Sequence, residues 1–498
     1  MAINPLSSSF LSFFLLSTTL VFLSSSSSKK LGFASEGRET IESNNHLLHH
    51  HTHTVQVRSL LPSTTCRPST IDPDRKASLK VIHKYGPCSQ VQQENSKIPT
   101  HAEILKQDEL RVKSIHSRLS NKLADRGSGD LRDVEASTNI PAKSGSTIGT
   151  GNYVVTVGLG TPKKELTLIF DTGSDLTWTQ CEPCAGSCYD QAETIFKPTV
   201  SMTYKNITCS SNLCYELVSA TGNKPRCTSS NTCVYGIQYG DQSFSIGFFG
   251  TERLTLTPTD VFDKFVFGCG QNNQGLFGRS AGLLGLGRNP ISFVQQTAPK
   301  YGGFFSYCLP SSSSSTGHLT FGKSRGGASK AVKFTPLSEA SDGTSFYGLD
   351  TTGISVGGRR LAIKASVFSA SGTIIDSGTV ITRLPPSAYS ALRTAFRKAM
   401  KAYPLTDPLS ILDTCYDLSN YDEITVPTIA FSFGGGVTVE LEAVGVFYIP
   451  RISQACLAFA GNGNASDVAI FGNVQQRTLE VVYDVAGERV GFGPASCS

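Results

Sequence analysis

Two seven-residue stretches decide the fold of this chain: LIFDTGS at residues 168–174 and TIIDSGT at residues 373–379. In each, an apolar run ends in an aspartate followed by a small hydroxyl residue and a glycine, and no other Asp-Ser/Thr-Gly triplet occurs in the sequence. A second apolar run ending in glycine follows each stretch, GLLG at 282–285 and AIFG at 469–472. This repetition predicts two β-rich copies of one unit, related by a pseudo-twofold axis, whose aspartate turns meet where the copies face each other.

The residues that follow each aspartate are predicted to support it. The glycine lets the backbone bend and lets the facing copy approach closely. The hydroxyl residue directly after the aspartate can bond across to the opposite turn. The hydroxyl residue three positions after it can bond the outer carboxylate oxygen and fix its orientation. The supporting residues are Thr172, Gly173, Ser174, Ser377, Gly378 and Thr379.

Asp171 and Asp376 are therefore the candidate reacting groups. Two carboxyls held this close cannot both ionise easily, so one keeps a proton, as in the aspartic-protease pair that is a standard example of such coupling. The ionised carboxylate can act as a base towards a water held between them, and the protonated one can polarise or protonate a carbonyl. This chemistry requires no metal, no cofactor and no covalent nucleophile.

The composition excludes several other mechanisms. Eight of the nine histidines precede residue 140, and only His318 follows it. A multi-histidine metal site is therefore impossible in the later part, and a Ser-His or Cys-His centre there would depend on this one side chain. The low charged fraction of 17%, with 47 glycines, favours a β-rich extracellular protein.

The first part of the chain has the features of a targeting sequence followed by a prosegment. Residues 10–23 form an apolar stretch of signal-peptide length, so we expect residues 1–24 to be a signal peptide and the protein to be secreted to the apoplast. A plastid transit peptide is the alternative, because no positive charge precedes the stretch and the first acidic residue is Glu36. A vacuolar destination is also left open.

Residues 25–140 are interpreted as a prosegment. Their histidine tract (HLLHHHTHT, 46–54) is interpreted as a solvated linker, with metal binding as the alternative. Residues 102–123 place apolar side chains at helical spacing opposite a basic face, which predicts an amphipathic helix. This helix either packs on the rest of the protein or simply has one solvated side. The following residues, 141–335 and 336–498, are expected to form the two lobes.

The cysteines indicate an oxidising compartment. Cys66 and Cys88 can pair within the prosegment, and twelve further cysteines follow residue 140, which predicts six disulfides. Seven of the twelve lie between residues 181 and 233, so at least one must pair outside this stretch, and Cys269 is the nearest candidate. Zinc at the first three cysteines, 181, 184 and 188, is the alternative. Sequons at Asn206 and Asn464 permit glycosylation.

From about residue 150 to the end, the sequence resembles the pepsin-like aspartic proteases, in particular the nepenthesin-like plant branch and the group around the chloroplast nucleoid DNA-binding protease. The resemblance rests on FDTGSDLTW at 170–178, IIDSGT at 374–379, VVYDVAGERVGF at 481–492 and a cysteine-rich insertion before Tyr239. It implies an all-β, bilobal acid-protease fold with a central cleft, in which Asp171 and Asp376 are catalytic.

The resemblance also assigns a substrate-binding flap. Tyr239 and Gly240 match the flap, and Trp178 matches the tryptophan that bonds the flap tyrosine, although a core aromatic is the alternative for Trp178. Gln242 stands where many relatives carry glycine. The disulfides implied by the family pattern are Cys188–Cys269, Cys209–Cys233, Cys214–Cys227, Cys308–Cys497, Cys415–Cys456 and Cys181–Cys184.

The expected function is that of a secreted, monomeric aspartic endopeptidase that cleaves proteins or peptides at acidic pH. The basic prosegment is expected to inhibit it by neutralising the catalytic carboxylates and to leave when acid protonates its partners. One alternative is a catalytically silent inhibitor or binding protein of the cell wall with the same fold. Another is a DNA-binding plastid protease, against which stands a net charge of only +1 after residue 140. No membrane partner is expected.

Overall fold

The computed structural model describes residues 51–69, 77–90, 99–127, 153–239, 242–275, 277–323, 331–338, 340, 345–494 and 497. The predicted signal peptide lies outside the described residues. The fold is mostly β-sheet, as predicted, with a few short helices and the longer α1 (His101–Gly127).

The predicted repetition is present as two five-strand units with the same pairing pattern. In each unit the strand order begins with an antiparallel pair, continues through a parallel and an antiparallel pair and ends with a parallel pair. The first unit is β3 (Tyr153–Leu159), β4 (Lys164–Asp171), β11 (Gly282–Gly285), β5 (Trp178–Gln180) and β10 (Asp260–Gln274). The second is β15 (Tyr347–Leu349), β18 (Thr373–Ile375), β28 (Ala469–Phe471), β19 (Thr382–Leu384) and β27 (Phe459–Gly461).

The first unit is part of a large sheet that also takes in the end of the chain. β29 (Glu480–Asp484) pairs with β12 (Phe304–Cys308), so the terminal VVYDVAGERVGF motif lies in the sheet of the first half. The remaining strands of this sheet are β2 (Ser78–His83), β6 (Lys205–Asn206), β7 (Arg226–Cys227), β8 (Cys233–Gln238), β9 (Phe244–Thr257), β13 (Thr316–Phe321), β14 (Lys333–Pro336) and β30 (Arg489–Gly493).

Three smaller sheets complete the second half. They contain β16 (Thr351–Val356), β17 (Arg359–Arg360), β23 (Ile429–Phe433) and β24 (Val437–Leu441); β20 (Leu405–Thr406), β21 (Cys415–Tyr416), β25 (Phe447–Arg451) and β26 (Gln454–Leu457); and β1 (Thr52–Gln56) with β22 (Glu423–Pro427). The helices are α2 (Asn212–Thr221), α3 (Phe293–Gln296), α4 (Ala298–Tyr301), α5 (Ser366–Ser369), α6 (Pro386–Ala399), α7 (Ala443–Val446) and α8 (Asn473–Gln476).

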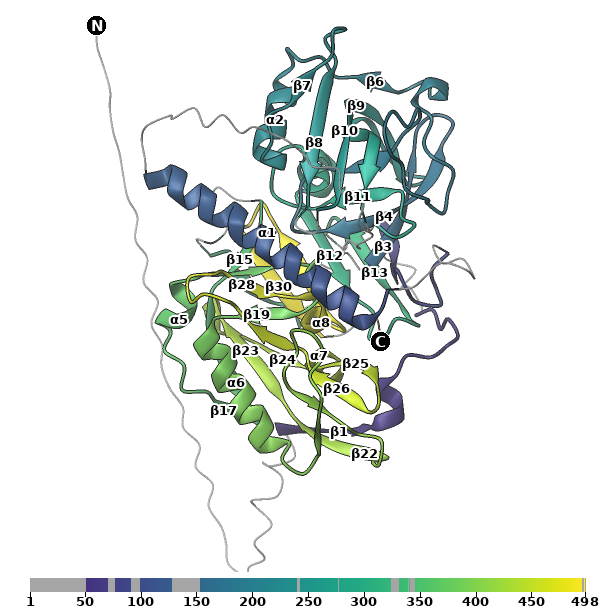
Figure 1. Ribbon diagram of the computed structural model, residues 1–498. Helices are drawn as coiled ribbons and strands as arrows, with labels where there is room; N and C mark the ends of the chain where they lie inside the picture. The colour runs from purple at the N-terminus through teal and green to yellow at the C-terminus, as the bar shows by residue number, and fades with distance from the viewer. Residues whose placement is uncertain are drawn as a thin grey trace, which may run out of the picture. The chain divides into compact units, whose positions relative to one another are not determined.

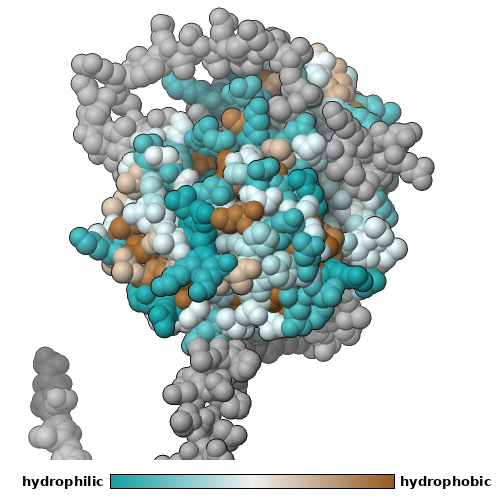
Figure 2. Space-filling model, turned by 60° about the horizontal axis from the view of Figure 1, so that its bottom comes forward, coloured by the Kyte–Doolittle hydropathy of each residue, from teal (hydrophilic) through white to brown (hydrophobic). Residues whose placement is uncertain are grey.

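Burial follows the sequence pattern of each strand. β4 is buried from Leu166 to Asp171 because both of its faces are covered, which explains its uninterrupted apolar run. β8 alternates between buried and partly exposed positions, as expected for a strand with one solvated face. Figure 2 shows one face of the molecule on which hydrophobic residues occur in small groups among hydrophilic ones. Within the described ranges, we find no helix whose length and apolar character would suit a membrane span.

The predicted prosegment is integrated into the fold. β2 lies between β13 and β3 in the large sheet, and Cys66 bonds Cys88. The helix predicted over residues 102–123 is α1, and its residues Leu105, Val112 and Ile115 are buried. In Figure 1 this helix runs between the teal strands of the first half and the green and yellow strands of the second.

The interpretation of the histidine tract as a solvated linker is wrong for the part that the structure describes. β1 pairs antiparallel with β22, from Thr52 opposite Pro427 to Gln56 opposite Glu423. A ring nitrogen of His53 lies 3.0 Å from the carbonyl oxygen of Leu441. The tract is therefore an edge strand whose backbone is paired, and no group of three or more potential metal ligands occurs among the described residues.

Three predicted disulfides are present and four are wrong. Cys308–Cys497, Cys415–Cys456 and Cys66–Cys88 form as expected. Cys269 bonds Cys181 rather than Cys188, because β5 places Cys181 beside β10, where both cysteines are fully buried. Cys184 and Cys188 then close a short loop with each other, which excludes the zinc alternative.

The other correction concerns the cysteines around α2. Cys214 bonds Cys233, and Cys209 bonds Cys227, which exchanges the predicted partners. Cys214 on α2 is buried and faces the buried Cys233 at the start of β8, whereas Cys209 and Cys227 lie at partly or fully exposed positions. Burial thus sorts the four cysteines into an inner and an outer bridge. All 14 cysteines of the chain are paired.

Candidate active site

Each predicted aspartate turn stands at the end of the second strand of its unit. Asp171 ends β4 and Asp376 directly follows β18, and their exposed fractions are 1% and 0%. The backbone of each is tied to the neighbouring parallel strand. The amide of Leu286 donates to the carbonyl of Asp171 at 2.9 Å, and the amide of Asp376 donates to the carbonyl of Phe471 at 3.2 Å. The two carboxyl groups are therefore carried on rigid sheet ends.

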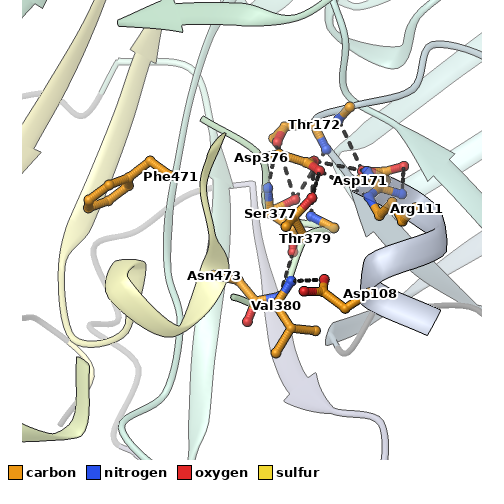
Figure 3. Close-up of polar contacts among 12 residues, drawn as sticks. Asp108, Arg111, Asp171, Thr172, Asp376, Ser377, Thr379, Val380, Phe471 and Asn473 are labelled. Atoms are coloured by element: carbon orange, nitrogen blue, oxygen red, sulfur yellow. Dashed lines mark hydrogen bonds and ion pairs between the residues drawn. The ribbon is translucent and has the colours of Figure 1, made fainter. Parts of the chain in front are cut away.

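The predicted cross-bonds between the turns are present (Figure 3). The amide of Thr172 donates to the Ser377 hydroxyl at 3.1 Å, and the amide of Ser377 donates to the Thr172 hydroxyl at 2.9 Å. The two hydroxyls are 3.3 Å apart, with that of Thr172 donating. Because all these groups are buried, the reciprocal bonds lock the two turns to each other.

The glycines of the turns are required for the close approach of the two halves. A Cβ atom added at Gly173 would stand 2.7 Å from an Asp376 carboxylate oxygen, and one added at Gly378 would stand 2.6 Å from an Asp171 carboxylate oxygen. Neither separation is compatible with van der Waals contact. The amides of Gly173 and Gly378 donate to the Oδ1 atoms of Asp171 and Asp376 at 3.0 and 3.1 Å.

The outer hydroxyls differ between the two turns. The Thr379 hydroxyl donates to Asp376 Oδ2 at 2.6 Å, as predicted. The Ser174 hydroxyl is buried and helps to lower the pKa of Asp171, but it makes no hydrogen bond of normal geometry within the described part of the chain. The predicted orienting bond is thus present in the second half and missing in the first.

Arg111 of α1 binds both aspartates. Its Nη2 atom lies 2.6 Å from Asp171 Oδ1 and 2.9 Å from Asp376 Oδ1, so the two carboxylates face each other across a single nitrogen. Its Nη1 atom donates to Asp171 Oδ2 at 3.2 Å, and its Nε atom donates to Asp376 Oδ2 at 2.9 Å. The helix therefore covers the pair with a guanidinium whose four hydrogen bonds are all charge-assisted (Figure 3).

The two carboxyls have different pKa directions. Burial raises the pKa of Asp171, but the charge and hydrogen bonds of Arg111 outweigh it and hold this pKa below its ordinary value. For Asp376, burial and the neighbouring Asp171 charge outweigh Arg111, so its pKa lies above its ordinary value. The arrangement favours an ionised Asp171 and a proton on Asp376.

A carboxylate of α1, that of Asp108, is buried about one helical turn before Arg111. Asp108 accepts hydrogen bonds from the amides of Val380 and Ile381 at 2.6 and 3.2 Å and from Arg383 Nη2 at 2.9 Å. Burial raises the pKa of Asp108, and Arg383 and the two amides only partly oppose this. The helix is thus anchored at two points beside the aspartate turns.

Three of these site residues were not predicted from the sequence: Asp108, Arg111 and Arg383. A signal was present, because Asp108 interrupts the apolar stripe of α1 between Leu105 and Val112 and is completely buried. A charged residue at such a position indicates a buried partner on the surface that the helix covers.

The predicted flap residues lie as the resemblance implies where they are described. Trp178 is fully buried, and its indole Nε1 donates to the Tyr239 hydroxyl at 2.8 Å. The rings of both residues contact Phe277. Gly240 lies outside the described residues. Gln242 has a φ angle of 67°, a left-handed conformation that glycine adopts more readily.

The two sequon asparagines are both exposed. Asn206 lies in β6, where its side-chain oxygen accepts a hydrogen bond from Tyr204 at 2.6 Å. Asn464 lies in a turn closed by its amide, which donates to Asp467 at 3.0 Å. Both asparagines therefore lie at the surface of the described part of the chain.

Comparisons with known proteins agree with this site. The family described as "Xylanase inhibitor N-terminal" matches residues 153–323, and "Xylanase inhibitor C-terminal" matches residues 346–494. An aspartyl protease family protein of Arabidopsis thaliana is 60% identical over 448 residues, covering 90% of this chain and 93% of that protein. The aspartic proteinase nepenthesin-1 of Nepenthes gracilis is 36% identical over 391 residues, covering 76% of this chain and 86% of that protein.

A solved structure supports the fold alone. The basic 7S globulin from soybean matches with a TM-score of 0.54 and 22% identity, covering 69% of this chain and 91% of that one.

Proposed function

Because this chain belongs to the pepsin-like aspartic proteases and is an aspartic-type endopeptidase, we propose that it is a secreted enzyme, made as a zymogen, that hydrolyses peptide bonds at acidic pH. A water activated by Asp171 and Asp376 would be the nucleophile. The observation that carries this proposal is the pair of buried carboxylates, locked face to face and bridged by one guanidinium of the preceding helix.

The proposed reaction uses the two carboxyls in different roles. The ionised Asp171 removes a proton from the water, whose oxygen attacks the carbonyl carbon of the peptide bond, while Asp376 gives its proton to the carbonyl oxygen. The tetrahedral intermediate then collapses as the C–N bond breaks. Asp171 returns its proton to the leaving nitrogen, and Asp376 recovers a proton from the hydroxyl that becomes the new carboxyl. Besides burial, the neighbouring Asp171 charge raises the pKa of Asp376 whether or not Arg111 is docked, which favours this assignment.

We assign to α1 the role of keeping the zymogen inactive. Arg111, whose side chain is only 13% exposed, occupies the space between the carboxylates that the reacting water and carbonyl require. Against the effect of burial, Arg111 lowers the pKa of Asp171 in the docked state, so this pairing stabilises docking while Asp171 is ionised and is lost as the pH falls through the lowered pKa. The raised pKa of Asp108 has the opposite sign and favours docking in acid. Release in acid is therefore attributed to the Arg111–Asp171 pair.

The seven disulfides are consistent with a secreted protein, and we assign it to the apoplast, with plastid or vacuole as alternatives. The exposed Asn206 and Asn464 are proposed glycosylation sites. The proposed working form is a monomer that acts on proteins or peptides.

A second candidate function is inhibition or binding of another protein, because both matching families are described as xylanase inhibitors. An inhibitor has no need of an intact reacting pair. Both turns here retain the aspartate, the hydroxyl residue and the glycine, together with their mutual hydrogen bonds, which favours the enzyme.

Single substitutions of the pair test the proposal. Asp171→Asn and Asp376→Asn should each lower pepstatin-sensitive proteolysis by the acid-treated protein by more than about 10³-fold, because each removes a general acid or base. Asp190→Asn is the matched control, since the Asp190 side chain is 80% exposed. Wild-type rates in either variant would contradict the assignment. Inhibition of a xylanase by all three variants, without proteolysis by the wild type, would favour the second candidate.

A further inference from the structure

Arg383 occupies the position in the second half that Trp178 occupies in the first. Each lies seven residues after the aspartate of its turn. Trp178 is opposite Leu283 of β11, and Arg383 is opposite Ile470 of β28, at corresponding register positions. Trp178 donates a hydrogen bond to Tyr239, which the family resemblance identifies as the flap residue that closes over substrate. By the same symmetry, Arg383 lies beside the region that substrate would occupy next to the second turn.

The surroundings of Arg383 form a pocket for a carboxylate. Its side chain is 4% exposed, and its Nη1 atom donates to the carbonyl of Ile381 at 3.1 Å. Nη2 and the amides of Val380 and Ile381 all donate to Asp108, whose side chain is completely buried. Figure 3 shows Asp108 pointing from α1 towards the Val380 amide. Three donors thus converge on one carboxylate.

Departure of α1 would leave these donors without their acceptor. Asp108 is the carboxylate that pairs with Arg383 among the described residues. Leaving a guanidinium and two backbone amides unpaired at a largely buried site has a large desolvation cost. A new anion in place of Asp108 would offset this cost. The side of the pocket that α1 covers would also open towards the substrate.

We propose that Arg383 and the backbone amides of Val380 and Ile381 form an anion subsite of the mature enzyme that selects substrates with a glutamate or aspartate near the cleaved bond. The proposed anion subsite rests on the proposed function as a peptide-cleaving enzyme. Asp108 precedes Arg111 by three residues, or about 4.5 Å along a helix. An extended peptide advances about 3.3 Å per residue, so the acidic residue lies within three residues of the cleaved bond.

The alternative occupant is a neutral backbone carbonyl of the substrate. Such a carbonyl could accept from the two amides but would leave the Arg383 charge unpaired. A carboxylate matches the guanidinium in both charge and geometry, as Asp108 does in the docked helix. Substrate side-chain charge therefore distinguishes the two occupants.

The test compares matched quenched-fluorescent peptides cleaved by the acid-activated enzyme. Glutamine or glutamate is placed at each of the three positions on either side of the cleaved bond, and kcat/KM is measured at about pH 5, where a free glutamate is mostly ionised. At one position the wild type should prefer glutamate by about tenfold or more, as expected for a charge-assisted hydrogen bond. A ratio near one at every position would overturn the inference while leaving the proposed function intact.

Variants assign the preference to the pocket. Arg383→Gln should bring the glutamate-to-glutamine ratio close to one, and Arg383→Lys should retain part of it. Arg393→Gln, which removes another ion-paired arginine, is the control and should keep the wild-type ratio. An unchanged ratio in Arg383→Gln would overturn the inference, and if that variant does not fold, the wild-type ratios and Arg383→Lys decide. Failure of the wild type to cleave any peptide would overturn the proposed function and this inference with it.

Discussion

The two aspartate turns share a backbone arrangement but differ in the side chains around it. Both carry a glycine amide that donates to the carboxylate, and both turns bond across to the other. The second turn adds the Thr379 hydroxyl to its carboxylate, whereas the corresponding Ser174 makes no such bond of normal geometry. The symmetric part brings the carboxyls together, and the asymmetric part gives Asp376 a hydroxyl hydrogen bond that has no counterpart of normal geometry at Asp171.

The difference extends to the position seven residues after each aspartate. In the first half, Trp178 contributes an apolar ring and one neutral hydrogen bond to the flap tyrosine. In the second half, Arg383 contributes a buried charge that α1 satisfies. Equivalent positions of the two units thus carry an apolar ring in one half and a buried charge in the other.

Apart from the two aspartates themselves, the largest effect is expected at Arg111, which binds both carboxylates. Arg111→Gln leaves two buried carboxylates without their counter-charge, and loss of one partner of a buried pair costs about 3–5 kcal/mol. We expect removal of the prosegment at about pH 5 to become at least 100-fold faster, measured by gel electrophoresis and N-terminal sequencing.

Lys113→Gln on the same helix is the control. Its side chain is 65% exposed and pairs with Glu109, so processing should follow the wild-type pH dependence. Equal processing rates for Arg111→Gln and the wild type would show that Arg111 does not hold the helix in place.

A smaller effect on activity is expected when the outer hydroxyls of Thr379 and Ser174 are removed in turn. Thr379→Val removes a hydrogen bond that lowers the pKa of Asp376, so the pKa of the pair should rise. The alkaline limb of the pH profile of kcat/KM, where Asp376 loses its proton, should then move to higher pH. The maximum of kcat/KM should fall about tenfold. Ser174→Ala should change the maximum less than about twofold, because no bond of normal geometry is lost. Equal effects of the two variants would remove this distinction between the turns.

The smallest effect is expected at the flap. Trp178→Phe and Tyr239→Phe each remove the same neutral hydrogen bond and should lower kcat/KM by about threefold to tenfold. Because the bond is shared, the double variant should be no worse than either single one, and steady-state kinetics on one peptide would measure this. Additive losses would mean that the two residues act independently.

Much of the candidate site could be predicted because its signals are local. An apolar run followed by Asp-Thr-Gly specifies a strand and a turn within a few residues, and its repetition specifies how two such turns meet. The bond between Trp178 and Tyr239 followed from the family resemblance. The strand formed by the histidine tract was missed, because its polar side chains gave no sign that its backbone pairs with β22.

The exchanged disulfides were missed for a different reason. Cysteine spacing fixes how many bridges can form, but the choice between Cys227 and Cys233 as partner of Cys214 depends on which side of β8 faces α2.

The sequence by itself predicted the candidate pair of aspartates and the repeated β unit, since both follow from residue order over short distances. Only the tertiary structure decided that Arg111, among several basic residues of its helix, reaches the carboxylates, and that Asp108 reaches Arg383. These contacts join residues separated by up to 275 positions, and they depend on the rotation of α1 about its own axis as it lies between the two halves. Helical spacing predicts which side chains share a face, whereas packing against both halves selects which of them meets a charge.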